Sequence, residues 1–141
     1  MQPRGIYLSD KIIAYVEKTR GIKIEYGKLD ITFYRDDFKS SDQIHTPQKT
    51  VLPFSLTDKK VILVDDVLYT GRTIRSALDA LLDFGRPSKV ELLTLIDRRF
   101  KRQLPIQPDY VGKTIDSIHS QKVKVFWKEL DKKDEVVLLN E

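Results

Sequence analysis

The chain has 141 residues, of which 40% are hydrophobic and 33% are charged, the profile of a soluble globular protein. We expect residues 1–141 to form a single domain, and no apolar run is long enough to span a membrane. The chain contains no cysteine, which excludes disulfides and thiolate chemistry and fits a reducing cytoplasm. The net charge of +4 permits contact with phosphates or nucleic acid without requiring it.

The first third of the chain predicts a helix and a strand, followed by a long polar connection. Apolar residues recur at roughly helical spacing from Ile6 to Lys18, and Gly21 follows as a stop signal. Residues 29–34 are rich in β-branched and aromatic types, which predicts a strand. Residues 35–53 are polar and weakly periodic, and an unstructured connection of this length is often a lid or a binding loop.

The rest of the chain predicts an alternation of strands and helix. Four consecutive aliphatic residues at 61–64 predict a strand that is buried on both faces. An apolar stripe predicts a helix from Thr73 to Phe84, and residues 90–96 predict the next buried strand. Later strands are expected at 123–127 and 135–139. Strand, helix and strand in this order form a βαβ unit, which implies a parallel sheet with a right-handed crossover.

The segment after the first buried strand combines paired carboxylates with a phosphate-binding turn. In open α/β sheets, ligands bind beyond the carboxyl ends of the strands. Asp65 and Asp66 come directly after that strand, and a short turn with Gly71 opens into the helix. The free N–H groups of a first helical turn form an anion site, to which Thr70 and Thr73 can add hydroxyl donors. Carboxylates accept hydrogen bonds from sugar hydroxyls, so a ribose with a 5-phosphate is the natural ligand.

Simpler interpretations of these residues remain open. Thr70 or Thr73 could only cap the helix, and the paired acids could be a solvated turn or a Mg²⁺ site. Receiver domains of response regulators also show an aliphatic strand that runs into paired acids. Here, however, the pair runs straight into Thr-Gly-Arg-Thr, and the Gly-x-x-x-x-Gly-Lys-Ser/Thr pattern of a Walker A loop is absent.

The stretch from Val61 to Thr73 resembles the phosphoribosyl pyrophosphate motif of type I phosphoribosyltransferases. It contains four aliphatic residues, two acids, a short loop and Thr-Gly-Arg-Thr in that order. Other segments resemble one branch of that family, the PyrR-type bifunctional pyrimidine-operon regulators and uracil phosphoribosyltransferases. These segments are Tyr34–Asp37, Asp97–Arg98, Leu104–Ile106 and Asp109–Lys113. The likeness covers nearly the whole chain.

The resemblance implies an α/β type I phosphoribosyltransferase fold, a mostly parallel twisted sheet flanked by helices. It implies transfer of ribose 5-phosphate from phosphoribosyl pyrophosphate (PRPP) to uracil, which gives UMP and pyrophosphate with Mg²⁺ as cofactor. The expected partners are PRPP, uracil and UMP, a pyrimidine-operon leader mRNA, and further copies of the chain in a dimer or tetramer. One alternative is a UMP-sensing, RNA-binding transcriptional attenuator with little or no catalysis. Another is a PRPP-binding domain for a different base.

The resemblance also implies roles for individual residues. Arg4 would bind the leaving pyrophosphate and Arg35 would start a loop that closes over the site, and these two are the expected catalytic residues. Asp65 and Asp66 would hold the ribose hydroxyls and reach the metal only indirectly, through the ribose. The residues expected to bind PRPP are Asp65, Asp66, Val67, Leu68, Tyr69, Thr70, Gly71, Arg72 and Thr73. The expected pyrophosphate loop is Pro3, Arg4 and Gly5, and the expected base-binding residues are Asp97, Arg98 and Val123.

Without the resemblance, Arg4 would be read as a surface charge, Arg35 as a solvated side chain, and Asp97 with Arg98 as a local ion pair. The chain also departs from the family pattern. Pro3 stands where the family usually has Thr, and Arg99 stands where relatives usually have Gly. The helix and core strand that precede the pyrophosphate loop in relatives are not in this sequence, so we expect an exposed sheet edge, weak stability and a tendency to associate.

Overall fold

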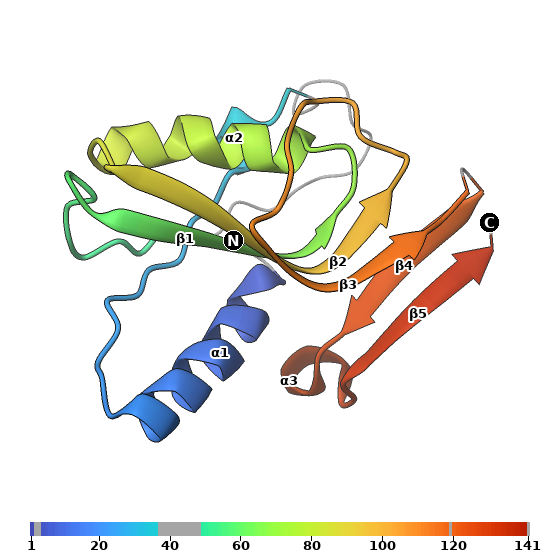
Figure 1. Cartoon of the computed structure of the whole chain (residues 1–141), viewed down its shortest axis with the longest axis horizontal. Coiled ribbons are helices and arrows are strands. Elements are labelled where there is room, and N and C mark those ends of the chain that lie inside the picture. The colour runs from blue at the N-terminus through green and yellow to red at the C-terminus, as the bar shows by residue number, and fades with distance from the viewer. Residues whose placement is uncertain (2–3, 37–48, 119, 141) are drawn as a thin grey trace.

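A three-stranded parallel sheet forms the centre of the computed structural model (Figure 1). The structure describes residues 1, 4–36, 49–118 and 120–140. The strands lie in the order β1-β2-β3, and β2 pairs in parallel with both of its neighbours. Their bounds are Lys60–Leu68 for β1, Lys89–Arg99 for β2 and Tyr110–Asp116 for β3. The predicted βαβ unit and parallel sheet are therefore confirmed.

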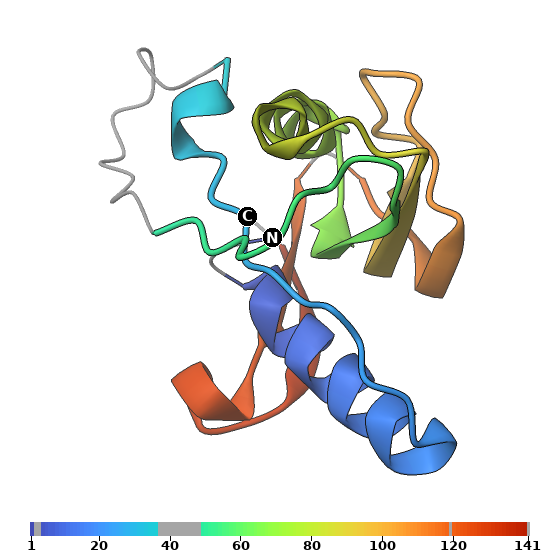
Figure 2. The same ribbon diagram turned by 90° about the vertical axis from the view of Figure 1, so that its left-hand side faces the viewer.

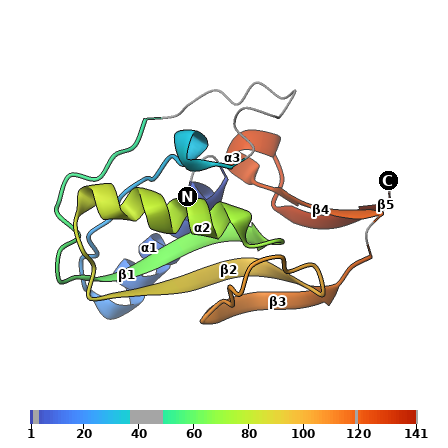
Figure 3. The same ribbon diagram turned by 90° about the horizontal axis from the view of Figure 1, so that it is seen from above.

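Helix α2 (Arg72–Leu81) connects β1 to β2 and covers one face of the sheet (Figures 1 and 3). A single 3-10 turn, η2 (Leu82–Phe84), continues it, so the predicted helix is confirmed with a tighter last turn. The apolar stripe of α2 packs on the sheet because its residues are spaced for one face. The buried residues of β1, β2 and α2 in this core are Leu63, Leu68, Ile74, Ala77, Ala80, Leu81 and Leu92.

Helix α1 and the C-terminal hairpin form the second core, on the other side of the sheet (Figure 2). Helix α1 (Gly5–Arg20) confirms the first predicted helix, and Gly21 ends it in the left-handed conformation. Strands β4 (Gln121–Phe126) and β5 (Glu135–Asn140) pair antiparallel and confirm the two late strands, with the short helix α3 (Lys128–Asp131) between them. The buried residues here are Leu8, Ile96, Val125 and Trp127.

The predicted strand at residues 29–34 is wrong. The segment carries a 3-10 turn, η1 (Thr32–Tyr34), instead. Asp30 favours this turn, because its carboxylate accepts hydrogen bonds from the N–H of Thr32 at 3.3 Å and from its hydroxyl at 2.8 Å. Two aliphatic residues of the segment, Leu29 and Ile31, are buried in the first core. The apolar signal therefore reported burial in a loop, not a strand.

Strand β3 was not predicted, and its attachment to β2 begins at Asp109. The N–H of Asp109 donates to the carbonyl of Leu92 at 2.8 Å, and the Asp109 carboxylate accepts the N–H of Leu92 at 2.7 Å. Parallel pairing then starts with Leu93 opposite Tyr110. Asp109 thus adds a backbone and a side-chain hydrogen bond at the point where β3 joins the sheet.

We expect Asp109→Ala to destabilise the protein by about 1–3 kcal/mol, because it leaves the N–H of Leu92 without its charged acceptor. Denaturant unfolding measures this difference. The matched control is Asp116→Ala, which removes a carboxylate from the other end of β3 that pairs with exposed Arg99. Exposed pairs contribute at most about 1 kcal/mol, so equal losses in the two variants would contradict this role for Asp109.

Strand β2 is the one strand neighbour of β1 in the described part of the chain, so β1 forms a sheet edge there. The expected effects of that edge on stability and association stay predictions. In the same described part, no helix combines the length and apolar character needed to cross a bilayer.

Candidate functional site

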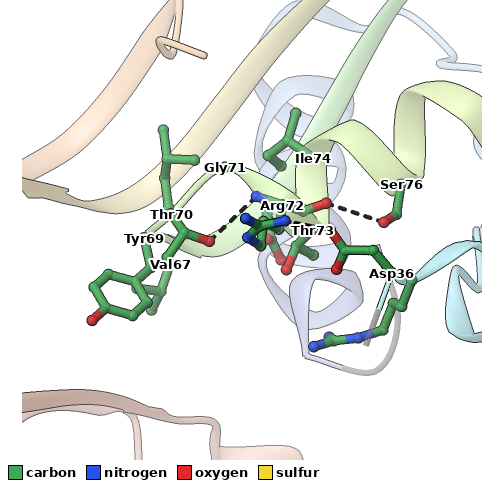
Figure 4. Close-up of a pocket in the computed structure, with 12 residues that line it drawn as sticks. Asp36, Val67, Tyr69, Thr70, Gly71, Arg72, Thr73, Ile74 and Ser76 are labelled. Atoms are coloured by element: carbon green, nitrogen blue, oxygen red, sulfur yellow. Dashed lines mark hydrogen bonds and ion pairs between the residues drawn. The ribbon is translucent and has the colours of Figure 1, made fainter. Parts of the chain in front are cut away.

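A cavity of about 550 Å³ lies at the carboxyl end of β1 (Figure 4). The residues that line it are Arg35, Asp36, Asp65, Val67, Leu68, Tyr69, Thr70, Gly71, Arg72, Thr73, Ile74 and Ser76. The structure therefore brings together Arg35 and all of the predicted PRPP-binding stretch except Asp66. Asp36, Ile74 and Ser76 were not predicted to be site residues.

The two acids lie within β1 and not in a loop, which corrects the expectation that the strand ends at Val64. Parallel pairing with β2 continues through Asp65, opposite Thr94, as far as Leu68, opposite Asp97. Backbone pairing does not depend on side-chain polarity, so the strand continues after its aliphatic run has ended. The connecting turn is consequently short, and the cavity receives a carboxylate from a rigid strand.

Burial changes the acidity of both carboxyl groups. Asp65 is 8% exposed, and burial, followed by the neighbouring charge of Asp66, raises its pKa to about 7. Burial also raises the pKa of Asp66, whose Oδ1 accepts the N–H of Val67 at 2.9 Å. Two acids so close in a low dielectric titrate as a pair. Near neutral pH the pair favours ligands that donate hydrogen bonds or develop positive charge.

The turn into α2 has the geometry of an anion site. Gly71 is the N-cap residue with φ of 92°, in the left-handed region that favours glycine. Because Gly71 has no side chain, the N-cap residue makes no capping hydrogen bond, and neither threonine is the N-cap. The Thr70 hydroxyl accepts the N–H of Arg72 at 3.3 Å, and the N–H groups of Thr73 and Ile74 have no intrahelical acceptor. Those two amides and the helix dipole favour a bound anion.

Two arginines bring positive charge to the cavity. Arg72 forms an ion pair with Asp36 (Figure 4). The Nε of Arg72 also donates to Oε1 of Gln103 at 2.7 Å. Arg35 precedes Asp36 in the chain and also lines the cavity. The loop it was predicted to start lies mainly in residues 37–48, outside the described residues.

Arg4 does not line this cavity. Its guanidinium donates to the carbonyl of Val125 at 2.8 Å and to Asp131 at 2.9 Å. Gly5 lies against β1, because a Cβ added to it would come within 2.8 Å of the Val64 carbonyl. Pro3, the remaining residue of the predicted pyrophosphate loop, lies outside the described residues.

The predicted base-binding residues lie at the end of β2 and on β4. Asp97 pairs with Arg102 and not with its neighbour Arg98. Arg98 is 5% exposed, and its guanidinium lies 4.0 Å from the ring centroid of Tyr69, which is also a cavity residue. Arg98 thus contacts a wall residue of the cavity without lining the cavity itself.

Hydrogen bonds to Ser117 Oγ at 2.8 Å and to the Gln121 carbonyl at 2.7 Å hold Arg98 in this place. Val123, on β4, packs against the second core and lines no part of the cavity. The structure therefore places two of the three predicted base-binding residues beside the cavity wall: Asp97 lies opposite Leu68, and Arg98 packs on Tyr69.

Comparison with known proteins identifies the family. The model of the phosphoribosyl transferase domain family matches residues 3–130. The chain belongs to the phosphoribosyltransferase family. This confirms the predicted fold class, and the family is one of enzymes that transfer phosphoribosyl groups.

Relatives with the name "Bifunctional protein PyrR" confirm the predicted branch. The one from Picosynechococcus sp. is 48% identical over 136 residues, which cover 96% of this chain and 76% of the relative. The one from Halalkalibacterium halodurans is 48% identical over 140 residues, which cover 98% and 77%.

A solved hypoxanthine phosphoribosyltransferase from Staphylococcus aureus is 25% identical with a TM-score of 0.46, covering 67% of this chain. The chain spans 53% of that structure's length.

Proposed function

We propose that this chain is a uracil phosphoribosyltransferase that makes UMP and pyrophosphate from uracil and PRPP, with a second role in regulating pyrimidine genes. The observation that carries the proposal is the cavity at the end of β1, where a buried carboxylate faces an uncapped helix N-terminus. An acceptor for sugar hydroxyls and donors for a phosphate are the two halves of a ribose 5-phosphate site.

The proposed binding mode divides the cavity into two parts. The N–H groups of Thr73 and Ile74 and the hydroxyl of Thr70 take the 5-phosphate, as the uncapped start of α2 allows. Asp65 and Asp66 accept hydrogen bonds from the ribose hydroxyls. Because burial disfavours charge on these carboxylates, ligand hydroxyls that donate hydrogen bonds to them bind favourably, whereas an anion beside them would not.

In the reaction, the bond from the ribose anomeric carbon to pyrophosphate breaks, and pyrophosphate leaves with the electron pair. Uracil nitrogen forms the new bond and loses its proton. Positive charge develops on the ribose as the old bond breaks. The buried carboxylates are already fixed in place, so they stabilise that charge without reorganisation of solvent. The chain contributes position and electrostatics, with no covalent enzyme intermediate.

Mg²⁺ fits this donor set in an indirect way. Mg²⁺ prefers carboxylate, phosphate and water oxygens, and usually keeps several waters. In the described part of the chain, no three acidic or histidine side chains gather to form a full protein cage. Asp65 and Asp66 would therefore hold the ion through the ribose hydroxyls, and the bound ion would supply charge neutralisation to the leaving pyrophosphate.

We assign Arg35 and Arg4, with Pro3 and Gly5, to pyrophosphate, and Asp97, Arg98 and Val123 to the base. Arg4 would have to exchange Asp131 for pyrophosphate. The exchange would also release the hydrogen bond from Arg4 to the Val125 carbonyl.

The direct test is formation of labelled UMP from labelled uracil and PRPP with Mg²⁺, with hypoxanthine and orotate as competing bases. Of the three bases, we expect only uracil to react, giving UMP and an equimolar amount of pyrophosphate. If hypoxanthine or orotate gives a nucleotide and uracil does not, the substrate is that base and the proposed uracil specificity is wrong. Binding of PRPP without product from any base would favour the non-catalytic alternative.

The word "bifunctional" in the names of the relatives supports a second, regulatory role. We propose that the chain binds a pyrimidine-operon leader mRNA in a UMP-dependent way. Residues 98–102 (Arg-Arg-Phe-Lys-Arg) form a basic cluster in the sequence, but much of its charge is not available to RNA. Arg98 is buried, Arg99 pairs with Asp116, and Arg102 pairs with Asp97. Binding to leader RNA that weakens steeply with salt and strengthens with UMP would support the role, and equal binding to unrelated RNA would contradict it.

A further inference from the structure

Three residues after β2 hold the turn at the end of β1 from the side opposite the cavity. Arg102 Nη1 donates to the Tyr69 carbonyl at 2.6 Å. The N–H groups of Gln103 and Leu104 both donate to the Thr70 carbonyl, at 2.9 and 3.2 Å. Two successive carbonyls of the turn are thus directed toward the same segment of chain. None of the three donors lines the cavity.

We call residues 102–104 the strap, and its hydrogen bonds determine which way the amides of the turn face. A trans peptide directs its carbonyl and its N–H in opposite directions. Because the carbonyls of Tyr69 and Thr70 face the strap, the N–H groups of Thr70 and Gly71 face away from it. Tyr69, Thr70 and Gly71 all line the cavity, so this is the cavity side. Successive N–H groups that converge in a turn form an anion-binding concavity.

Side-chain packing supports the same arrangement. A Cβ added to Gly71 would lie 3.4 Å from Ile106 and 3.5 Å from Leu104, so the turn rests directly on these two side chains. Arg102 also pairs with Asp97 at the end of β2. The strap is therefore fixed both to the turn and to the neighbouring strand, and it can hold the turn in one conformation.

We propose that Arg102, Gln103 and Leu104 are positioning residues that direct the N–H groups of Thr70 and Gly71 toward the 5-phosphate. The inference rests on the proposed function, since it assigns an orienting device to the same phosphate site. It assigns the direction of two amides of the predicted PRPP-binding stretch to a segment that lines no part of the cavity. Without these hydrogen bonds the two peptides could rotate and present their carbonyls to the anion.

Amide NMR of the ¹⁵N-labelled protein titrated with ribose 5-phosphate tests the inference directly. We expect saturable shifts of the Thr70 and Gly71 amides together with those of Thr73 and Ile74. Shifts confined to Thr73 and Ile74 would overturn the role of the strap and leave the phosphate site intact. The absence of a response from all four would contradict the proposed phosphate site itself.

A pair of charge-matched variants supplies the second test. Arg102→Met removes the hydrogen bond to Tyr69, and Lys101→Met removes the same charge from the adjacent position. We expect ribose 5-phosphate to bind roughly tenfold more weakly to Arg102→Met, because losing this hydrogen bond lets the turn populate orientations whose amides do not face the cavity. The Thr70 amide shift should shrink in that variant only. Equal affinities for ribose 5-phosphate in the two variants would overturn the proposal, and the titration of the unaltered protein decides the question if Arg102→Met does not fold.

Discussion

Asp65→Asn is expected to make the protein more stable above pH 7 and to remove most of its transferase activity. The folded protein raises the pKa of Asp65 from its ordinary value of 3.8 to about 7, so it holds this proton more tightly than the unfolded chain does. The stability that this proton contributes is complete below pH 4 and is lost as pH rises through 7. At about 1.4 kcal/mol for each pKa unit, the loss is at most about 4 kcal/mol.

Asparagine cannot ionise, so the variant escapes the loss that the native protein suffers between pH 4 and pH 7. Denaturant unfolding at a series of pH values measures the difference in stability between the variant and the native protein. Asp79→Asn, on the exposed face of α2, is the control. The activity should fall by about 10²–10³ in kcat/KM, because an amide is a poor substitute for a carboxylate near developing positive charge. A variant that loses activity without gaining stability above pH 7 would contradict the burial of Asp65 and its raised pKa.

Gly71→Ala is expected to raise the KM for PRPP by roughly 10–100-fold while the fold persists. Gly71 has φ of 92°, where a Cβ costs about 1–2 kcal/mol, and the added methyl would lie in van der Waals contact with Ile106 at 3.4 Å. The turn can relieve that strain only by rotating the peptides that face the phosphate. Steady-state kinetics with varied PRPP measures the effect.

The chain provides a matched control in Gly21→Ala. Gly21 ends α1 with φ of 63°, and a Cβ there would meet nothing within 4 Å. Both variants should lose stability from the same backbone strain, but only Gly71→Ala should lose affinity for PRPP. Similar kinetics in the two variants would show that the turn conformation is not required for binding.

The sequence was sufficient to predict the elements whose burial follows a regular pattern. Strand β1, helix α2 and strand β2 bury aliphatic residues at strand or helix spacing, so their order and the parallel sheet could be predicted. Strand β3 is exposed along most of its length, and what attaches it to the sheet is a long-range contact between Asp109 and Leu92. Because β3 is exposed, it lacks the alternation of buried and exposed residues that marks a half-buried strand.

The candidate site was predictable where it is continuous in sequence and unpredictable where it depends on tertiary contacts. The stretch from Asp65 to Thr73 carries its own chemistry, with acids followed by a turn and a helix start. The strap behind that turn and the pair between Asp36 and Arg72 join segments more than thirty residues apart. Their partners are ordinary polar residues, so only the fold reveals that they meet.

The central claim is that the acids of β1 and the start of α2 bind the two halves of one ribose 5-phosphate. A crystal structure with PRPP and Mg²⁺ tests it most directly. The expected result is a 5-phosphate on the amides of residues 70–74, with the ribose hydroxyls on Asp65 and Asp66. Density for PRPP at any other place on the protein, with this cavity filled only by water, would contradict the account.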